Sequence, residues 1–477
     1  MISPTAISRR QLLVEGVAAF AVPFLIPSHV LATPRRTGAN DNIHLGFIGA
    51  GRRGQQLLEA MPEGVKIVAV CDVYRPRADA VGGKYGAKAV HDFRQVLDRK
   101  DVDAVVIATP DHWHALPAVL ACQAGKDVYC EKPLALTVHE GRLMVKAARK
   151  YDRVFQVGTQ QRSLRPNRIA CKIVRSGAMG RVHRVVVANN RGPSGEWLPR
   201  EDVPEGLDWD RWLGQAPGDL PYNNRYVFPE NEPGWSGFYA FSGGEMCGWG
   251  AHGLDQVQWA LGMDGSGPVE VYAGDDPDQP GDAHVQWKYP GGVVMETGDA
   301  PKPGGHFFCE RGQIDIDRNR FNIMPEGLKR ELLHGVDVAE TPEENHMKNF
   351  LECVRTRRRP HADVEIGQRS VTVAHLGNIA RWVGGRLEWS PAEERFTNND
   401  KANRHLDRER RKGYELPEAG CIRHEKPFPE KRNVSKTSGL AREEILRRQC
   451  GAHDAAADPS RQESSPTCRR RRATPAP

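Results

Sequence analysis

The sequence predicts an α/β protein in which a doubly wound parallel sheet is followed by an α+β domain with a large open, mostly antiparallel sheet. In the first part of the chain, short apolar runs alternate with helical patterns, which is the order typical of parallel strands joined by helices. In the second part, strand-like runs succeed one another with turn residues between them. The length of 477 residues and a hydrophobic content of 39% are sufficient for two such cores.

The first domain is predicted over residues 43–160. Its first strand is an apolar run that begins at Ile43 and leads into Gly49-x-Gly51-x-x-Gly54 and then into a helical pattern. Glycines at these positions allow a tight turn, the close approach of a pyrophosphate and the packing of the helix on the strand, while the N-terminus of the helix faces the anion. The motif therefore predicts a Rossmann domain that binds a dinucleotide. A glycine turn without a ligand is the alternative.

The second predicted strand, KIVAVCDV, favours one of the two nicotinamide dinucleotides. It ends at Asp72, 23 residues after Gly49, where a carboxylate binds the hydroxyl groups of the adenosine ribose. Because a carboxylate repels a 2′-phosphate, NAD is the predicted cofactor. Arg75 and Arg77 follow closely and keep NADP as the alternative.

Further strands are predicted along both domains. The run DAVVIATP ends at Thr109 and Pro110, and DVYCEKP follows one helix later. The second domain is predicted over residues 161–415. Its strands are expected in RVHRVVVANNRG, PVEVYAG, AHVQWKYPGGVVMET and GQIDIDRNRFNI, and ENHMKNFLECVRTRR predicts an amphipathic helix with Met347, Phe350, Leu351 and Val354 on one face.

The chain resembles a known family from about Ile43 to about Tyr414. The resemblance is carried by GAGRRG, by TPDHWHALPAVLACQAGKDVYCEKPLAL with its E-K-P tripeptide, and by GGEMCGWGAHGLDQVQWALG. These runs are similar to those of the glucose-fructose oxidoreductase, inositol dehydrogenase and rhizopine catabolism (Gfo/Idh/MocA) family. The resemblance implies an NAD(P)-dependent oxidoreductase acting on CH–OH groups of a sugar, polyol or glycoside. It also implies that the open sheet covers the nicotinamide and builds homo-oligomers.

Lys132 is the first candidate catalytic residue. It follows a buried strand, at the edge where open α/β sheets bind ligands. The resemblance makes Glu131-Lys132-Pro133 the E-K-P of the family and implies that the lysine lies beside the nicotinamide and the substrate hydroxyl. A lysine partly removed from water has a lowered pKa and can exchange a proton with an alcohol. A surface lysine before a proline is the alternative.

His252 is the second candidate, at the start of a predicted helix. The resemblance implies the active-site histidine, a general base for the sugar hydroxyl, and imidazole suits that task because its pKa is close to the working pH. Helix capping or packing is the alternative. The family usually has an aspartate four residues earlier, where this chain has Gly248. Either Lys132 and His252 suffice, or Asp255 or a residue from another segment substitutes, or the reaction is not simple alcohol oxidation.

The run DHWH, from Asp111 to His114, contains three potential metal ligands in four residues. No second cluster at ligand spacing accompanies it, so no metal is predicted. The resemblance places this run along the nicotinamide ribose and gives Gln160 a position that reaches the cofactor or substrate. The predicted cofactor-binding residues are Gly49, Gly51, Gly54, Asp72, Thr109, Pro110, Asp111, His114, Glu131, Lys132 and Gln160. An aromatic-rich stretch that begins at LDWDRW predicts either stacking on a sugar ring or core packing.

The amino terminus predicts export. Arg9 and Arg10 in SRRQLL precede a mostly apolar run from Gly16 to Pro27 and the small-residue site Val30-Leu31-Ala32. The run is too short to span a bilayer, so residues 1–32 are predicted to be a signal peptide. The arginine pair resembles a twin-arginine export signal, with a general secretory signal as the alternative. The expected location is periplasmic or otherwise outside the cytoplasm, without a membrane span.

The formal net charge of +6 lies in the C-terminal tail. After Gly420 there are 13 Lys and Arg against 7 Asp and Glu, so the remainder is neutral and nothing indicates nucleic-acid binding. Residues 420–477 are rich in Ser, Pro, Ala and Arg and are predicted to be disordered. Seven scattered cysteines precede the tail without metal-type spacing, which predicts buried thiols.

These features together predict an exported oxidoreductase that keeps its cofactor. Twin-arginine export carries folded proteins, so the cofactor is loaded in the cytoplasm, and no pool of nicotinamide replaces it outside. The bound cofactor must then be regenerated on the enzyme, by a second substrate or within one catalytic cycle. An NAD-dependent redox-neutral glycoside hydrolase or lyase is one alternative, and a non-catalytic sugar-binding protein is another.

Overall fold

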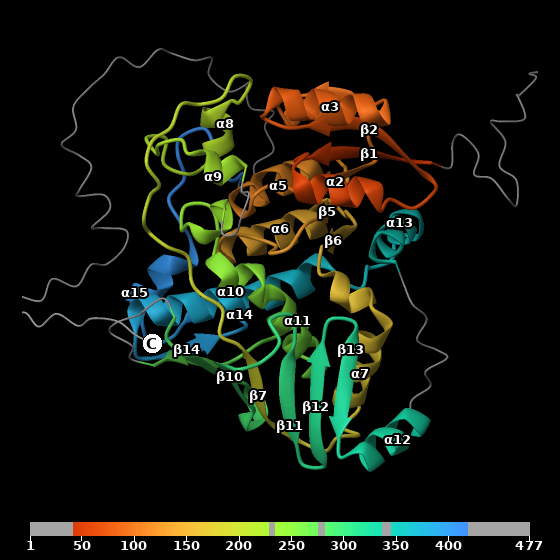
Figure 1. The fold of residues 1–477 in the computed structure, drawn as a ribbon, viewed down its shortest axis with the longest axis vertical. Coiled ribbons are helices and arrows are strands. Elements are labelled where there is room, and N and C mark those ends of the chain that lie inside the picture. The colour runs from red at the N-terminus through yellow and green to blue at the C-terminus, as the bar shows by residue number, and fades with distance from the viewer. Residues whose placement is uncertain (1–41, 229–233, 275–281, 336–344, 418–477) are drawn as a thin grey trace, which may run out of the picture. The chain divides into compact units, whose positions relative to one another are not determined.

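The computed structural model describes residues 42–228, 234–274, 282–335 and 345–417. The predicted signal peptide and the predicted disordered tail lie outside the described residues. Among the described residues, no helix is both long and apolar enough to cross a bilayer. Two sheets and the helices packed against them make up the described chain (Figure 1).

The first sheet is parallel throughout and has six strands in the order β3-β2-β1-β4-β5-β6. Alternate residues of its central strands enter two different hydrophobic clusters, so the sheet is buried on both faces. The predicted doubly wound sheet is therefore confirmed. The strands are β1 (Ile43–Ile48), β2 (Val65–Cys71), β3 (Lys88–Val90), β4 (Ala104–Ile107), β5 (Asp127–Cys130) and β6 (Phe155–Val157).

One helix of this domain, α6, begins with a side-chain cap. The side chain of Thr137 accepts a hydrogen bond from the Glu140 backbone at 3.2 Å, while the Glu140 carboxylate accepts from the Leu136 backbone at 3.0 Å. This reciprocal capping fixes the start of α6. The helices are α2 (Arg52–Glu59), α3 (Arg75–Tyr85), α4 (Arg94–Leu97), α5 (Ala115–Gln123) and α6 (Val138–Lys150).

A helix from far along the chain completes the core of the first domain. The predicted amphipathic helix is confirmed as α13 (His346–Thr356), with Met347, Phe350 and Leu351 buried. These side chains belong to the same hydrophobic cluster as Phe47 of β1. Figure 1 shows α13 beside the first domain, so its packing partner is the first sheet.

The second sheet has nine strands in the order β13-β12-β11-β7-β10-β9-β8-β14-β15. In this sheet only β7 and β10 pair in parallel, and hairpins form between β9 and β10 and between β12 and β13. The mostly antiparallel sheet is thus confirmed, although β11, β14 and β15 were not predicted. The strands are β7 (Val182–Ala188), β8 (Glu270–Ala273), β9 (Val285–Lys288), β10 (Val294–Gly298), β11 (Gly305–Cys309), β12 (Gly312–Asp317), β13 (Arg320–Met324), β14 (Arg386–Ser390) and β15 (Arg395–Phe396).

Helices cover one face of the second sheet. In β9, Val285 and Trp287 are buried, whereas Gln286 and Lys288 are exposed on the other face. The indole of Trp287 donates a hydrogen bond to the carbonyl of Val373 at 3.1 Å. The sheet therefore has one packed face and one open face. The covering helices, which share one hydrophobic cluster with the strands, are α7 (Arg165–Arg175), α11 (Gly250–Ala260) and α14 (Val364–Val383).

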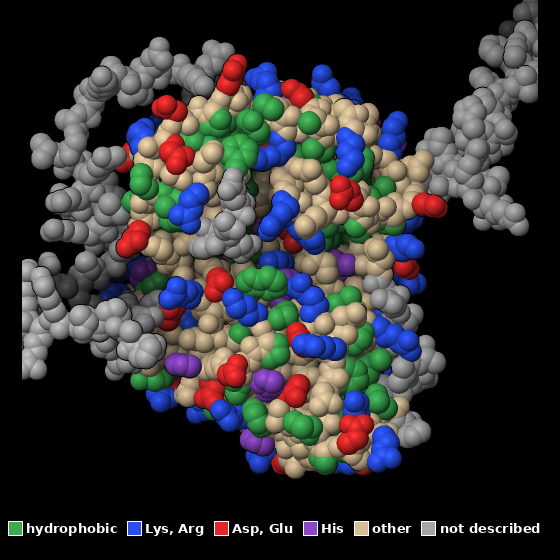
Figure 2. All heavy atoms as spheres, in the orientation of Figure 1, with side chains coloured by type: hydrophobic (Ala, Val, Ile, Leu, Met, Phe, Trp, Pro, Cys, Tyr) green, Lys and Arg blue, Asp and Glu red, His purple; other side chains and the backbone are tan. Residues whose placement is uncertain are grey.

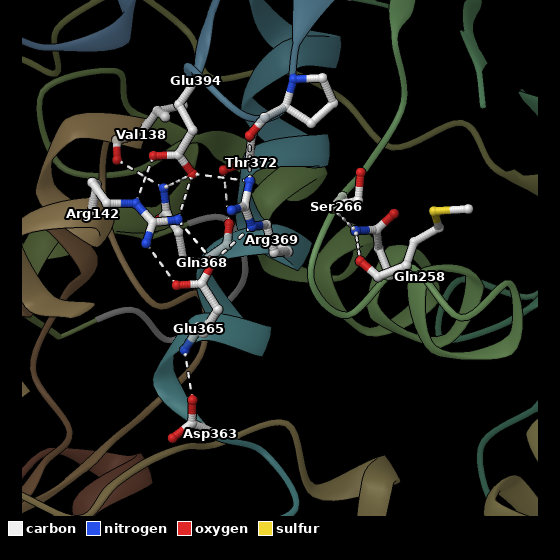
Figure 3. Close-up of polar contacts among 12 residues, drawn as sticks. Val138, Arg142, Gln258, Ser266, Asp363, Glu365, Gln368, Arg369, Thr372 and Glu394 are labelled. Atoms are coloured by element: carbon white, nitrogen blue, oxygen red, sulfur yellow. Dashed lines mark hydrogen bonds and ion pairs between the residues drawn. The ribbon is translucent and has the colours of Figure 1, made fainter. Parts of the chain in front are cut away.

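A partly buried polar network joins α6 of the first domain to α14 (Figure 3). Arg142 of α6 donates to Glu394 at 2.7 Å and to Glu365 at 2.6 Å. Arg369 donates to the same Glu365 carboxylate at 2.7 Å. Because one carboxylate accepts from two guanidinium groups on different helices, the network fixes the contact between α6 and α14.

A long connection between β7 and α11 is rich in aromatic side chains. We call its residues 195–228 and 234–243 the aromatic segment. The rings pack largely on one another: the Trp209 and Trp212 rings stack with centroids 4.9 Å apart, and Tyr222 meets Trp209 edge-on at 5.1 Å. Core packing is thus the role of these three rings. The remaining helices are α8 (Trp209–Leu213), α9 (Asn224–Val227), α10 (Gly244–Gly248), α12 (Glu326–Gly335) and α15 (Asp400–Asn403).

The aromatic segment is bound to the first domain by backbone hydrogen bonds. The carbonyl of Gly206 accepts from the Arg75 backbone at 2.9 Å, next to the end of β2. The carbonyl of Trp212 accepts from the indole of Trp113 at 2.8 Å. These contacts place the segment against the edge of the first sheet at which its strands end.

Candidate active site

A cavity of about 930 Å³ lies where the order of the first sheet reverses, at the carboxyl ends of its strands. Side chains of both domains line it. Of the predicted site residues, Gly54 and His114 are not part of the lining. Figure 2 shows Lys and Arg side chains gathered across the middle of one face of the molecule. The other predicted site residues all line the cavity, namely Gly49, Gly51, Asp72, Thr109, Pro110, Asp111, Glu131, Lys132, Gln160 and His252.

The three glycines of the first loop serve different purposes. Gly49 has a φ of +93°, and a Cβ there would lie 2.7 Å from the carbonyl oxygen of Ala108. A Cβ on Gly54 would lie 2.2 Å from the carbonyl oxygen of Gly49, so close packing of α2 requires glycine. Gly51 instead borders open space, with no atom within 4 Å of its Cβ position. The loop is therefore open toward the cavity, as a pyrophosphate at the N-terminus of α2 requires.

Two buried polar atoms of the lining lack partners. Within the part of the chain that the structure describes, Thr109 Oγ1 and His252 Nδ1 make no hydrogen bond. A buried polar atom without a partner costs about 1–3 kcal/mol, and at a cavity wall a bound ligand can supply the missing partner. Their positions, together with the open glycine loop, fit a dinucleotide and a polar substrate.

Asp72 lies at the end of β2 and is buried. Its carboxylate accepts hydrogen bonds from the backbone of Ala50 at 3.0 Å and of Tyr74 at 2.9 Å. Arg77 approaches it at 3.4 Å and also lies over the ring of Phe228, 5.2 Å from its centroid. The carboxylate is thus fixed at the place where the ribose of the dinucleotide is expected, with one arginine beside it.

We expect Asp72→Ala to weaken NAD binding about tenfold or more, because it removes a charged hydrogen-bond acceptor. Discrimination against NADP should relax at the same time, since the repulsive charge is lost and Arg77 is released from its ion pair. Dissociation constants for both dinucleotides, measured on cofactor-free protein, test this. Asp79→Ala, at an exposed position of α3, is the control. Preference of the unaltered protein for NADP would show that the arginines outweigh the carboxylate.

Glu131 is the centre of a network at the end of β5. Its Oε1 accepts from Arg53 at 2.9 Å and from Gln160 at 2.9 Å, and its Oε2 accepts from the backbone of Lys132 at 3.1 Å. Gln160 also donates to the hydroxyl of Tyr129 at 3.0 Å. Glu131 and Gln160 therefore bind each other and orient the backbone that carries Lys132.

The ammonium group of Lys132 reaches from the first domain to the second. Its Nζ donates to the carbonyl of Gly248, at the end of α10, at 3.2 Å. Burial lowers the pKa of Lys132, and the nearby carboxylates of Glu131 and Asp111 oppose this shift. A lysine in this position can donate a hydrogen bond to a substrate oxygen and exchange a proton with it.

His252 lies in the first turn of α11 and is 5% exposed. Burial lowers its pKa well below the usual value, and the positive charges of Lys132 and Arg318 lower it further. The ring is therefore neutral at ordinary pH and has an acceptor nitrogen. A neutral imidazole with a free nitrogen in a cavity suits a general base.

The position of the missing aspartate is open in the structure. No atom lies within 4 Å of a Cβ built on Gly248. Asp255 does not substitute, because it is buried in an ion pair with Arg162 at 2.8 Å and lies outside the cavity lining. Asp111 is one of several acids from other segments that line the cavity, and its carboxylate accepts from the hydroxyl of Ser242 at 2.7 Å.

The DHWH run does not form a metal site in the described residues, where no group of three ligating side chains meets. His112 bonds the carbonyl of Trp212 at 3.0 Å. His114 bonds the carbonyls of Pro133 at 2.8 Å and Thr109 at 3.0 Å. Two carbonyl acceptors require two N–H donors, so His114 positions the strand ends as a protonated ring.

Sequence reasoning missed several residues of the lining: Arg53, Ser242, Trp249 and Arg318. Arg53 lies inside the GAGRRG loop, where its position between two motif glycines was a usable signal. Arg318 lies in a hairpin turn, and nothing in the sequence of this turn indicates that it faces the cavity. The guanidinium of Arg318 lies over the ring of Trp249, and this tryptophan is 38% exposed.

Two family models match the chain. One, described as "Oxidoreductase family, NAD-binding Rossmann fold", covers residues 43–159, and the other, "Oxidoreductase family, C-terminal alpha/beta domain", covers residues 166–416. The chain belongs to the Gfo/Idh/MocA oxidoreductase family. The first domain of this Gfo/Idh/MocA protein is thus an NAD-binding Rossmann domain, as predicted.

Curated relatives match only part of this Gfo/Idh/MocA chain. An inositol 2-dehydrogenase of Salmonella typhimurium is 32% identical over 168 residues, 34% of this chain and 49% of the relative. An alpha-N-acetylgalactosaminidase of Shewanella oneidensis is 32% identical over 150 residues, 29% of this chain and 33% of the relative. The chain therefore spans half or less of the length of these relatives.

Solved structures share the fold. The WlbA dehydrogenase of Bordetella pertussis, solved with NADH and UDP-GlcNAcA, superposes with a TM-score of 0.54 at 20% identity. The match covers 73% of this Gfo/Idh/MocA chain and 99% of the WlbA chain. At this identity, the likeness concerns the two-domain architecture alone.

Proposed function

We propose that this protein is an exported, nicotinamide-dependent oxidoreductase that acts on a CH–OH group of a sugar, polyol or glycoside. One observation carries the proposal: Lys132 and the unpartnered Nδ1 of His252 line one cavity next to the NAD-binding loop. Burial lowers the pKa of both side chains, so one is a neutral acceptor and the other is a donor that gives up its proton more readily. This is the pair of properties that alcohol oxidation requires.

His252 and Lys132 have different roles in the proposed reaction. NAD held by the glycine loop and Asp72 would supply the hydride acceptor for the carbon that carries the hydroxyl group. The neutral ring of His252 takes the hydroxyl proton, and Lys132 donates a hydrogen bond to the same oxygen. The alcohol loses a hydride from carbon and a proton from oxygen, and it becomes a carbonyl compound.

The aromatic segment supports the proposal that the cofactor stays bound. Val227, Phe228 and Trp235 of this segment line the cavity together with the glycine loop of the first domain. A dinucleotide in the cavity would thus contact both domains, which favours slow release. Slow release is what an exported enzyme without an external supply of NAD needs.

We expect protein recovered from the periplasm to carry a nicotinamide dinucleotide. The full chain, including residues 1–32, is expressed and fractionated, and the purified protein is denatured and assayed for released NAD(H). Replacing Arg9 and Arg10 with lysine should retain the protein in the cytoplasm, still loaded. Periplasmic protein without a nicotinamide would contradict retention. Unchanged export of the double lysine variant would contradict the twin-arginine route.

A redox-neutral glycoside hydrolase or lyase is a second candidate. Gly248 at the usual aspartate position and the similarity to the Shewanella glycosidase favour it. In this cycle a hydroxyl is oxidised, an adjacent bond is eliminated or hydrolysed, and the ketone is reduced again by the same bound cofactor. A panel of polyols and glycosides distinguishes the candidates. Net formation of reduced nicotinamide supports the oxidoreductase, leaving-group release without net reduction supports the glycosidase, and binding alone indicates a sugar-binding protein.

A further inference from the structure

The cavity contains an arginine that the proposed reaction does not use. Arg318 lies in the turn between β12 and β13, and its side chain lines the cavity with Lys132 and His252. The turn itself is anchored, because the backbone of Asn319 donates to the side chain of Asn167 at 2.9 Å. Arg318 thus projects from a fixed point of the second sheet toward the reacting groups.

Two contacts hold the guanidinium group of Arg318 in place. Its Nε donates to Oε1 of Gln161 at 3.2 Å, and buried Gln161 in turn donates to the carbonyl of Pro303 at 2.8 Å. The guanidinium also lies over the ring of Trp249, 5.6 Å from its centroid. With Nε engaged, the edge of the guanidinium that carries the two terminal nitrogens remains for a ligand.

Among the described residues Arg318 forms no ion pair, although the nearby carboxylate of Asp317 raises its pKa. The carboxylate of the adjacent Asp317 forms an ion pair with Arg320 at 2.5 Å. It also accepts a hydrogen bond from the backbone N–H of Arg318. Other arginines of the lining do have such partners, Arg53 in Glu131 and Arg77 in Asp72. Arg318 therefore differs from them in that no carboxylate of the described residues holds its guanidinium group in an ion pair.

Positive charges act on the proposed base. Lys132 and Arg318 both lower the pKa of His252. Burial and Arg53 lower the pKa of Arg318 itself, and Asp317 opposes this shift. Oxidised nicotinamide adds a further positive charge when it is bound. Arg53 is paired with Glu131, and Asp111 lies near Lys132, so Arg318 is the cation of this group that is left to favour a negatively charged substrate group.

We propose that the substrate carries a carboxylate, as in a sugar acid, and that Arg318 binds this carboxylate. The inference rests on the proposed function of the cavity and names the substrate class within it. Two parallel N–H groups match the two oxygens of a carboxylate in a single plane, and such charge-assisted pairs are among the strongest hydrogen bonds. The carboxylate also neutralises the field that weakens His252 as a base.

The test compares acidic sugars with their neutral counterparts. Holoenzyme is offered glucuronate against glucose, galacturonate against galactose, gluconate against sorbitol, and the hexose 6-phosphates. We expect kcat/KM for at least one acid to exceed that for its neutral counterpart by about tenfold or more. Arg318→Gln should remove this preference chiefly through KM, and Arg318→Lys should restore part of it. Arg320→Gln, in the same hairpin but outside the cavity lining, should change neither.

Several results would overturn the inference. Equal turnover of acid and neutral sugars would remove the need for a carboxylate, and preference for the phosphates would assign a different anion. Loss of bound NAD in Arg318→Gln, with the acid preference intact, would place Arg318 on the cofactor instead. Calorimetric binding of the same pairs separates this inference from the redox proposal. If the acids bind selectively, Arg318→Gln abolishes that binding and no turnover occurs, the carboxylate site is supported and the proposed reaction is refuted. If there is neither turnover nor acid-selective binding, the carboxylate site is refuted.

Discussion

Replacing His252 with alanine is expected to lower the rate of hydride transfer by roughly a hundredfold or more, with NAD still bound. His252 is buried at the cavity, and its Nδ1 has no partner among the described residues, so its loss removes the proton acceptor without breaking an internal hydrogen bond of that nitrogen. The measurement is single-turnover formation of reduced nicotinamide on the holoenzyme. His183→Ala, on an exposed position of β7, is the matched control.

The pH dependence follows from the lowered pKa of His252. Because the ring stays neutral well below its usual pKa, the rate should remain constant from neutral into mildly acidic solution and fall only as pH drops through the lowered pKa.

Lys132→Met should reduce the rate of hydride transfer as His252→Ala does, while Lys146→Met, at an exposed position of α6, should not. Retention of full activity by either the histidine or the lysine variant would remove that residue from the mechanism.

Replacing Gly248 with aspartate is expected to lower kcat/KM by roughly a hundredfold or more and to leave the melting temperature nearly unchanged. The protein itself has room, because nothing lies within 4 Å of the Cβ position. The new carboxylate would instead meet the substrate, or pair with Lys132, whose ammonium already bonds the carbonyl of the same residue at 3.2 Å. Such an ion pair would raise the pKa of Lys132 and oppose binding of an anion.

Neutral variants at the same position separate size from charge. Gly248→Asn has the shape of the aspartate without its charge, and Gly248→Ala adds a Cβ alone. Loss in the aspartate variant only would identify charge as the cause, whereas equal loss in the asparagine variant would identify occupied space. A faster oxidation of a plain polyol by Gly248→Asp would refute a specialised substrate, since the usual pair of the family would then have been restored.

The first domain could be predicted because its signals are local. The glycine loop, Asp72 and the E-K-P tripeptide each follow a buried strand, and parallel topology then brings them to one edge. The predicted buried thiols are likewise confirmed for the seven cysteines of the described chain, which are all buried and free of disulfides. Their scattered spacing was sufficient for that prediction.

The missed elements have signals that are weak or distant. α14 is buried on nearly every side, so its apolar residues show no single stripe, and amphipathic periodicity does not reveal it. Arg318 reaches the cavity only because the hairpin of β12 and β13 points there, which depends on the arrangement of two domains. Asp255 illustrates the opposite error: it is close to His252 in sequence, yet it is directed toward Arg162 in the core.

The position of α13 determines when during synthesis the protein can first hold its cofactor. The core of the first domain needs Met347, Phe350 and Leu351, which leave the ribosome about 190 residues after β6. A nascent chain that ends before α13 has every strand of the first sheet but an exposed apolar face on it. Capture of the dinucleotide therefore belongs to the last stage of folding, when most of the chain has already been made.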